Sequence, residues 1–124
     1  KQFLRFAGHF YDNWDEGRTS LLLEQFGVKP DLKIEELSKG NRVKLGLISA
    51  MGHRPSLLLL DEPTSGLDPL IRLDILEFLK SLSHNENVSI LLSSHISDDL
   101  DQIADSILIL NNGRVVEYAR SPFA

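Results

Sequence analysis

The pattern of hydrophobic and polar positions changes its period near residue 55. Before that point, apolar residues recur every three or four positions, which is the spacing of an amphipathic helix. After it, short continuous apolar runs alternate with amphipathic segments, as in strands joined by helices. The predicted helices cover residues 3–10, 39–52, 69–82 and 97–103. A further predicted helix has an Asp or Asn of 11–15 as its N-cap, carries apolar positions at 21–23 and 26, and stops at Gly27. The predicted strands cover residues 57–60, 88–92, 107–110 and 115–118, with a turn at 111–114.

Local signals set the ends of several of these elements. Ser38 and Asp68 are expected N-caps, and Pro69 takes the first helical position after Asp68. Residues 83–87 are polar and predict a turn after the fourth helix. The four leucines at 57–60 lie between two prolines, which predicts a strand buried on both faces.

The order of the predicted elements indicates an α/β fold. Strand, helix, strand, helix, strand predicts crossover connections and a mainly parallel sheet. The change of period divides the chain into a helical part, residues 1–55, and an α/β part, residues 56–124. The fold class is therefore a helical subdomain followed by part of a mainly parallel sheet.

Composition and charge exclude several classes of protein. The chain has 124 residues with a formal net charge of −5, and its basic residues are not clustered. Nucleic acid is not an expected partner, because contacts with a phosphate backbone need clustered Lys and Arg. The absence of cysteine excludes disulfides and thiolate metal sites. No apolar run approaches the roughly 20 residues that cross a bilayer.

Candidate chemistry lies where two predicted strands end. Asp61 and Glu62 follow the first strand, and His95 follows the second. If the two strands are parallel neighbours, these side chains meet at one sheet edge, where α/β proteins bind ligands. Carboxylate oxygens suit Mg²⁺, Glu62 could deprotonate a water, and His95 could donate to a phosphate oxygen. The alternative is an acidic pair that simply marks where the strand meets solvent.

Three motifs together resemble the ABC-type ATPases. LLLLDEPTSGLD at 57–68 is similar to their Walker B and D-loop segment, LSKGN at 37–41 is similar to their signature motif, and His95 stands where they have the switch histidine. The order and spacing agree over about residues 35–118. FYDNWD at 10–15 is similar to a segment of bacterial multidrug- and peptide-antibiotic-exporter ATPases. The signature departs from the commonest form, with Lys39 in place of Gly and Asn41 in place of Gln.

The resemblance implies a role for each matching residue. Asp61 would hold Mg²⁺ through water, Glu62 would be the general base, and His95 would contact the γ-phosphate of ATP. Asp68 would link the two active sites of a dimer. The partners implied are a second ABC ATPase domain and a transmembrane permease subunit, which places the protein at the cytoplasmic face of the membrane. The residues expected to act on the partner's ATP are Ser38, Lys39, Gly40 and Asn41.

One motif of the family is absent from this sequence. No G-x-x-x-x-G-K-[ST] occurs, so the loop that cradles phosphate is missing. We therefore expect the chain to be the C-terminal half of the ATPase domain of a bacterial export transporter, and to lack activity by itself. Residues 57–60 and Leu110 should then expose apolar edges and favour self-association. The alternatives are a naturally truncated interaction module, a non-transport ABC ATPase, and an unrelated metal-dependent hydrolase using Asp61, Glu62 and His95.

Overall fold

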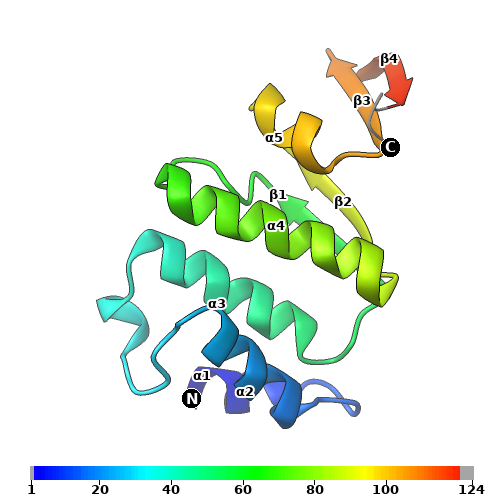
Figure 1. The fold of residues 1–124 in the computed structure, drawn as a ribbon. Coiled ribbons are helices and arrows are strands. Elements are labelled where there is room, and N and C mark those ends of the chain that lie inside the picture. Colours follow the sequence, from blue (N-terminus) through cyan, green and yellow to red (C-terminus); the bar gives the residue numbers. More distant parts are fainter. Residues whose placement is uncertain (1, 121–124) are drawn as a thin grey trace.

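The first half of the chain is helical. The computed structural model describes residues 2–120, and helices α1, α2 and α3 precede the first strand (Figure 1). Their N-terminal caps follow local chemistry: Asp15 accepts a hydrogen bond from the Arg18 amide, and Ser38 accepts one from the Asn41 amide. The elements are α1 (Gln2–Gly8), α2 (Glu16–Gln25), η1 (Ile34–Glu36) and α3 (Lys39–Met51).

Within the described residues, the second half contains two separate pairs of strands. Strand β1 (Leu57–Asp61) lies parallel to β2 (Ser89–Ser93), and α4 (Pro69–Glu86) connects them. Helix α5 (Ser97–Ile103) leads to β3 (Ser106–Asn111), which pairs antiparallel with β4 (Arg114–Arg120). The turn between β3 and β4 has positive φ at Asn112 and Gly113, as a two-residue type I′ hairpin requires.

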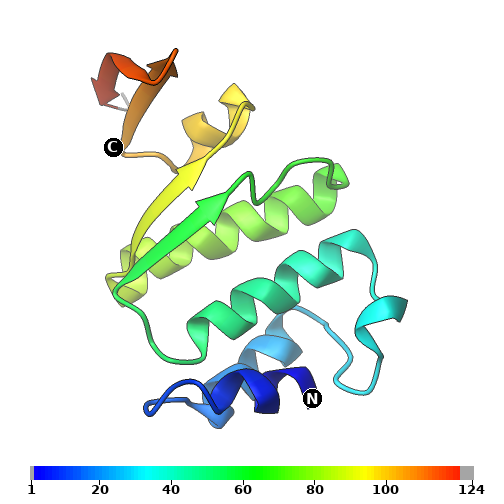
Figure 2. The ribbon, with the colours of Figure 1, turned by 180° about the vertical axis from the view of Figure 1, so that it is seen from behind.

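The parallel pairing of β1 and β2 confirms the predicted crossover, but the third strand does not join them. Strand β3 pairs only with β4, and this hairpin lies beyond α5, away from the helical half (Figures 1 and 2). The sequence expectation assumed that successive parallel units share one sheet. A hairpin with a tight Asn-Gly turn instead satisfies the backbone groups of β3 locally.

Helix α4 is longer than the sequence predicted. The polar residues 83–86 continue the helix, and Asn87 ends it in the left-handed conformation with φ of 53°. Asn tolerates this conformation better than most residues, so the end of the helix moves to Asn87. Among residues 2–120 no helix, α4 included, is apolar over a length that would cross a membrane.

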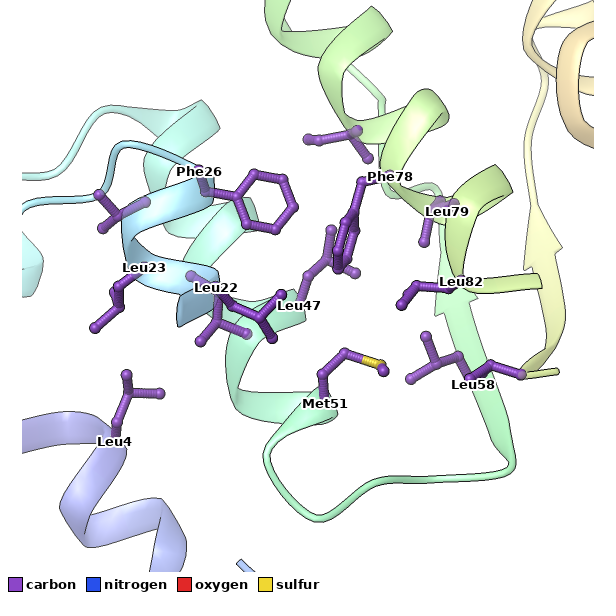
Figure 3. Close-up of a cluster of buried hydrophobic side chains, with 14 of the residues drawn as sticks. Leu4, Leu22, Leu23, Phe26, Leu47, Met51, Leu58, Phe78, Leu79 and Leu82 are labelled. Atoms are coloured by element: carbon purple, nitrogen blue, oxygen red, sulfur yellow. The ribbon is translucent and has the colours of Figure 1, made fainter. Parts of the chain in front are cut away.

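One hydrophobic core runs through both halves of the chain. Helices α3 and α4 lie side by side, with α2 against α3 and β1 behind α4 (Figures 1 and 2). Figure 3 shows Leu47 and Met51 of α3 facing Phe78 and Leu82 of α4. The Phe26 ring of the loop after α2 meets Phe78 edge to face, with ring centroids 4.5 Å apart.

The four-leucine strand is buried on one face only, which corrects the sequence prediction. Leu58 belongs to the core, whereas Leu57 and Leu59 are exposed. The physical reason is that the core packs against the face of Leu58, and the described elements leave the face of Leu57 and Leu59 uncovered. The expected exposure of apolar residues is confirmed for Leu57, Leu59 and Leu110, and it is wrong for Leu58.

The helix predicted for residues 3–10 is shorter in the structure, and its aromatic residues do not form a core face. Helix α1 ends at Gly8, and only Leu4 enters the core. Phe6 and Phe10 are exposed and contact each other edge to face, with ring centroids 5.2 Å apart. Phe10 lies beyond the end of α1, so the helical spacing of these residues does not bring them to one buried face.

We expect the exposed face of β1 and β2 to make the isolated chain self-associate. Leu59 and Leu91 are register partners, exposed by 68% and 60%. Exposed apolar strands at open edges pair with other chains. Sedimentation velocity should show larger species for the wild-type chain and mainly monomer for the Leu59→Lys/Leu91→Lys variant. Leu21→Lys on α2, where Leu21 is also 68% exposed, should leave the association unchanged. Equal association of all three chains would contradict the prediction.

The cap of α2 should make stability depend on pH. The pKa of Asp15 is lowered, mainly by the hydrogen bond from the Arg18 amide and also by Arg54, whose Nη2 lies 2.7 Å from Asp15 Oδ2. A lowered pKa stabilises the fold above the unfolded value of about 4, and this stabilisation is lost as the pH falls through the folded value. Asp15→Asn keeps a capping side chain but should flatten the acid side of the curve of thermal midpoint against pH. Asp12→Asn, in the same loop, should leave the curve unchanged.

Candidate functional site

A serine at the end of β2 organises the end of β1. The parallel register places Ser93 opposite Asp61. Ser93 Oγ donates to Asp61 Oδ1 at 2.6 Å and accepts from the Glu62 amide at 2.9 Å. Sequence reasoning did not single out Ser93 as a site residue. The signal that could have found it is the strand register, which puts the last residues of β1 and β2 side by side.

Glu62 and His95 meet at this sheet edge. His95 Nδ1 and Glu62 Oε2 are 2.8 Å apart, so the carboxylate accepts from the ring N–H. Glu62 has φ of 46°, an uncommon conformation for a residue with a side chain, and its amide is held by Ser93. Such strained positions are found where a structure fixes a side chain for function. The predicted meeting of Asp61, Glu62 and His95 at one edge is confirmed.

The loop between β1 and α4 is a compact turn. The Ser65 amide donates to the Glu62 carbonyl at 3.1 Å, and Gly66 takes a positive φ of 64°. The loop ends at Asp68, whose side chain accepts from the Leu70 amide at 2.9 Å. Asp68 is therefore the N-cap of α4, as predicted, and it is exposed there.

The start of α3 packs against this loop and the start of α4. A Cβ on Gly40 would lie 2.7 Å from Ile71 Cγ2, so only glycine lets the two helices approach here. The Lys39 ammonium lies over Gly66, since a Cβ on that glycine would be 2.5 Å from Nζ. Ser38 caps α3 through the Asn41 amide at 3.2 Å. Gly40 is buried against Ile71, and its expected role toward phosphate stays a prediction.

A cavity of about 430 Å³ lies between α3 and the end of β1, and some of the residues described above line it. Lys39 comes from the start of α3, Asp61 and Glu62 from the end of β1, and Ser65 from the following loop. The cavity thus joins a cation to two carboxylates, with the apolar side chains of Val43, Ala50 and Leu60 forming its walls. The lining does not include Ser38, Asp68 or His95.

The arrangement fits a water-mediated magnesium site rather than a complete protein cage. Within residues 2–120 no group of three or more His, Cys, Asp or Glu side chains is placed to hold a metal ion. Asp61 is exposed, and its Oδ1 is oriented by Ser93. Mg²⁺ is commonly held by one or two carboxylates together with waters and phosphate oxygens. The Asp61 side chain can supply that carboxylate, and the Glu62 carboxylate can accept a proton.

A family model and a curated relative each match most of the described chain. Residues 3–98 match the family model described as "AAA domain, putative AbiEii toxin, Type IV TA system". The chain is 43% identical over 97 residues to the bacitracin transport ATP-binding protein BcrA of Enterococcus faecalis. That similarity covers 77% of this chain and 32% of the relative, so the chain spans about a third of the length of the curated relatives it matches.

Solved structures share the fold. The structure of an ATP-binding subunit of an ABC transporter superposes with a TM-score of 0.82 and 32% identity, over 96% of this chain and 51% of that one. A dimeric ATP-binding cassette in a post-hydrolysis state, bound to ADP and Pi, superposes with a TM-score of 0.78 over 92% of this chain and 52% of that one. At 20% identity, the second similarity shows the fold alone.

Proposed function

The chain belongs to the ABC-type ATPases, and from that membership we propose that it supplies the signature, carboxylate and switch-histidine part of an ATP-hydrolysing domain in a bacterial export transporter. The observation that carries the proposal is the joint placement of Asp61, Glu62 and His95 at the end of the parallel strands. We keep residue 55 as the boundary between the helical and the α/β parts.

The proposed hydrolysis step uses Glu62 as a general base. Its carboxylate would accept a proton from the water that attacks the terminal phosphate of ATP. The contact with Ser93 holds the Glu62 backbone, and the contact with His95 Nδ1 restricts the rotamers of the Glu62 carboxylate at the sheet edge. Bound Mg²⁺ would neutralise developing charge on the phosphates, and Asp61 would hold it.

His95 would orient Glu62 and contact the terminal phosphate. Its Nδ1–H donates to Glu62 in this structure, and an imidazole that is protonated on both nitrogens can donate to a phosphate oxygen as well. The side chain is exposed, which leaves it accessible to a ligand. Lys39 adds a cation to the same cavity as Asp61 and Glu62, which supports phosphate binding there.

We propose a second ATPase domain as one partner. Ser38, Lys39 and Asn41 at the start of α3, and Asp68 at the start of α4, would act on the nucleotide of that second domain. The close packing of Gly40 on Ile71 supports this, because it keeps the two helix starts together on one surface. The solved cassette with ADP and Pi, which shares this fold, is dimeric.

We propose a transmembrane permease as the other partner, which would hold the protein at the cytoplasmic face of the membrane. The supporting feature is an apolar cavity of about 590 Å³ between α1 and the segment that follows α2. Phe3, Phe6, Leu32 and Ile34 line this cavity and are exposed. Exposed apolar surface of this kind suits a protein partner. The export direction rests on the resemblance of residues 10–15 to exporter ATPases.

A chimeric cassette tests the proposed activity. The corresponding segment of the bacitracin transport ATP-binding protein of Enterococcus faecalis would be replaced by this chain, because the two are 43% identical over 97 residues. We expect the chimera to hydrolyse ATP, and the 124-residue chain alone to bind Mg-ATP weakly without turnover. A folded chimera without hydrolysis would overturn the proposal. Robust hydrolysis by the isolated chain would contradict the expectation that turnover needs the phosphate-cradling loop, which this sequence lacks.

A further inference from the structure

A buried carboxylate lies close to the candidate site but outside it. Asp99 of α5 is 1% exposed, whereas its neighbour Asp98 is exposed. Thr64 Oγ1 donates to Asp99 Oδ2 at 2.5 Å, and Arg72 Nε lies 2.6 Å from Asp99 Oδ1 as an ion pair. A buried carboxylate is strongly unfavourable unless it is paired and hydrogen-bonded. Asp99 therefore depends on both Thr64 and Arg72 to offset the cost of its burial.

The two contacts come from the segments that carry the other site residues. Thr64, itself buried, lies two residues after Glu62 in the loop that ends at Asp68. Arg72 lies in the first turns of α4. Asp99 lies four residues after His95. A single side chain thus joins the loop after β1, the start of α4 and the segment after β2.

Helix α5 has other attachments at its far end. Lys80 Nζ of α4 donates to the Gln102 carbonyl at 3.4 Å, and Ile103 packs against the core cluster. Those contacts lie at the C-terminal end of α5, remote in sequence from His95. Asp99 lies in the first turn, so it fixes the end of the helix that follows His95 directly. The contacts of Gln102 and Ile103 therefore attach the C-terminal end of α5, and the contacts of Asp99 attach the end that follows His95.

We propose that Asp99 is a positioning residue, which holds the Glu62 loop and the His95 segment at the spacing that allows the contact between these two side chains. The catalytic meaning of that contact rests on the proposed function. The positioning itself is a property of the chain alone. A free hinge at either segment would separate Nδ1 of His95 from the Glu62 carboxylate, which lie 2.8 Å apart.

The test is nuclear magnetic resonance of the 124-residue chain with isotope-labelled histidine rings, in which every chain compared also carries Leu59→Lys and Leu91→Lys to keep it mainly monomeric. His95→Gln identifies the His95 signals, and Glu62→Ala gives their positions when the acceptor at residue 62 is removed. We expect Asp99→Asn to move the His95 signals from their wild-type positions toward the positions seen in Glu62→Ala. Asp98→Asn makes the same chemical change at the exposed neighbouring position and should leave them in place. The His53 ring stacks on Tyr11, with centroids 4.2 Å apart, and its unchanged signals report that the helical half is folded.

A milder pair of variants covers the case in which Asp99→Asn does not fold. Thr64→Val removes the hydroxyl that donates to Asp99 with little change of volume, and Thr64→Ser restores it. We expect the His95 signals to shift in Thr64→Val and to return in Thr64→Ser. Folded Asp99→Asn or Thr64→Val chains with wild-type His95 signals would overturn the proposal. An inactive chimera with the expected signals would count against the proposed function and leave the positioning role intact.

Discussion

Glu62→Gln in the chimeric cassette is expected to lower the rate of ATP hydrolysis by roughly 10²- to 10⁴-fold, the usual contribution of a general base. The amide cannot accept a proton from water, but its oxygen can still accept the hydrogen bond from His95 Nδ1. The substitution therefore removes the base while it preserves size and local contacts. Steady-state phosphate release at saturating Mg-ATP measures the effect on turnover.

A matched control separates this effect from a general change of charge. Glu77 is exposed on α4, and Glu77→Gln makes the same chemical change outside the site. We expect its rate to equal that of the unchanged chimera. Nucleotide binding, measured by fluorescence of a labelled ATP, should persist in Glu62→Gln because no binding group is removed. A variant with undiminished turnover would show that another group activates the water.

Leu79→Ala is expected to lower the free energy of unfolding of the chain by about 2–5 kcal/mol. Leu79 is 0% exposed in the core between α4 and its neighbours, so truncation leaves a cavity there (Figure 3). A domain of this size has a total stability of about 5–15 kcal/mol, so the loss is a large share of it. Urea unfolding followed by circular dichroism gives the change.

The control lies on the same helix. Leu73 is 43% exposed, and Leu73→Ala should change the free energy of unfolding by no more than about 0.5 kcal/mol. Helix α4 connects β1 to β2, so its packing also supports the sheet edge that carries Asp61 and His95. An unchanged urea midpoint in Leu79→Ala would mean that α4 is not anchored through this core.

Local sequence signals were sufficient for most helix starts and for the meeting of Glu62 with His95. Ser38 and Asp68 are caps because a short polar side chain before a helix satisfies its free amides, a relation within three residues. The meeting of Glu62 and His95 follows from the parallel pairing of two strands joined by one helix. These relations are local or topological, and a single sequence contains both.

Burial was harder to predict, because it depends on which surfaces find a partner. Leu58 and Leu59 are chemically identical neighbours, yet one is in the core and the other faces outward. Phe6 has the helical spacing of a core residue but lies on an exposed side of α1. A periodic apolar pattern identifies a face that can be buried, and it does not say whether any element covers that face.

The sequence by itself determined the type of most elements, the family resemblance and the identity of the acid pair and histidine, because these depend on residue types at fixed spacing. Only the tertiary structure decided the role of Ser93 between the two strands, the separation of β3 from the sheet of β1 and β2, and the buried position of Asp99. Each of these depends on contacts between residues distant in the chain. Such contacts are set by the packing of whole elements, which no short segment of sequence encodes.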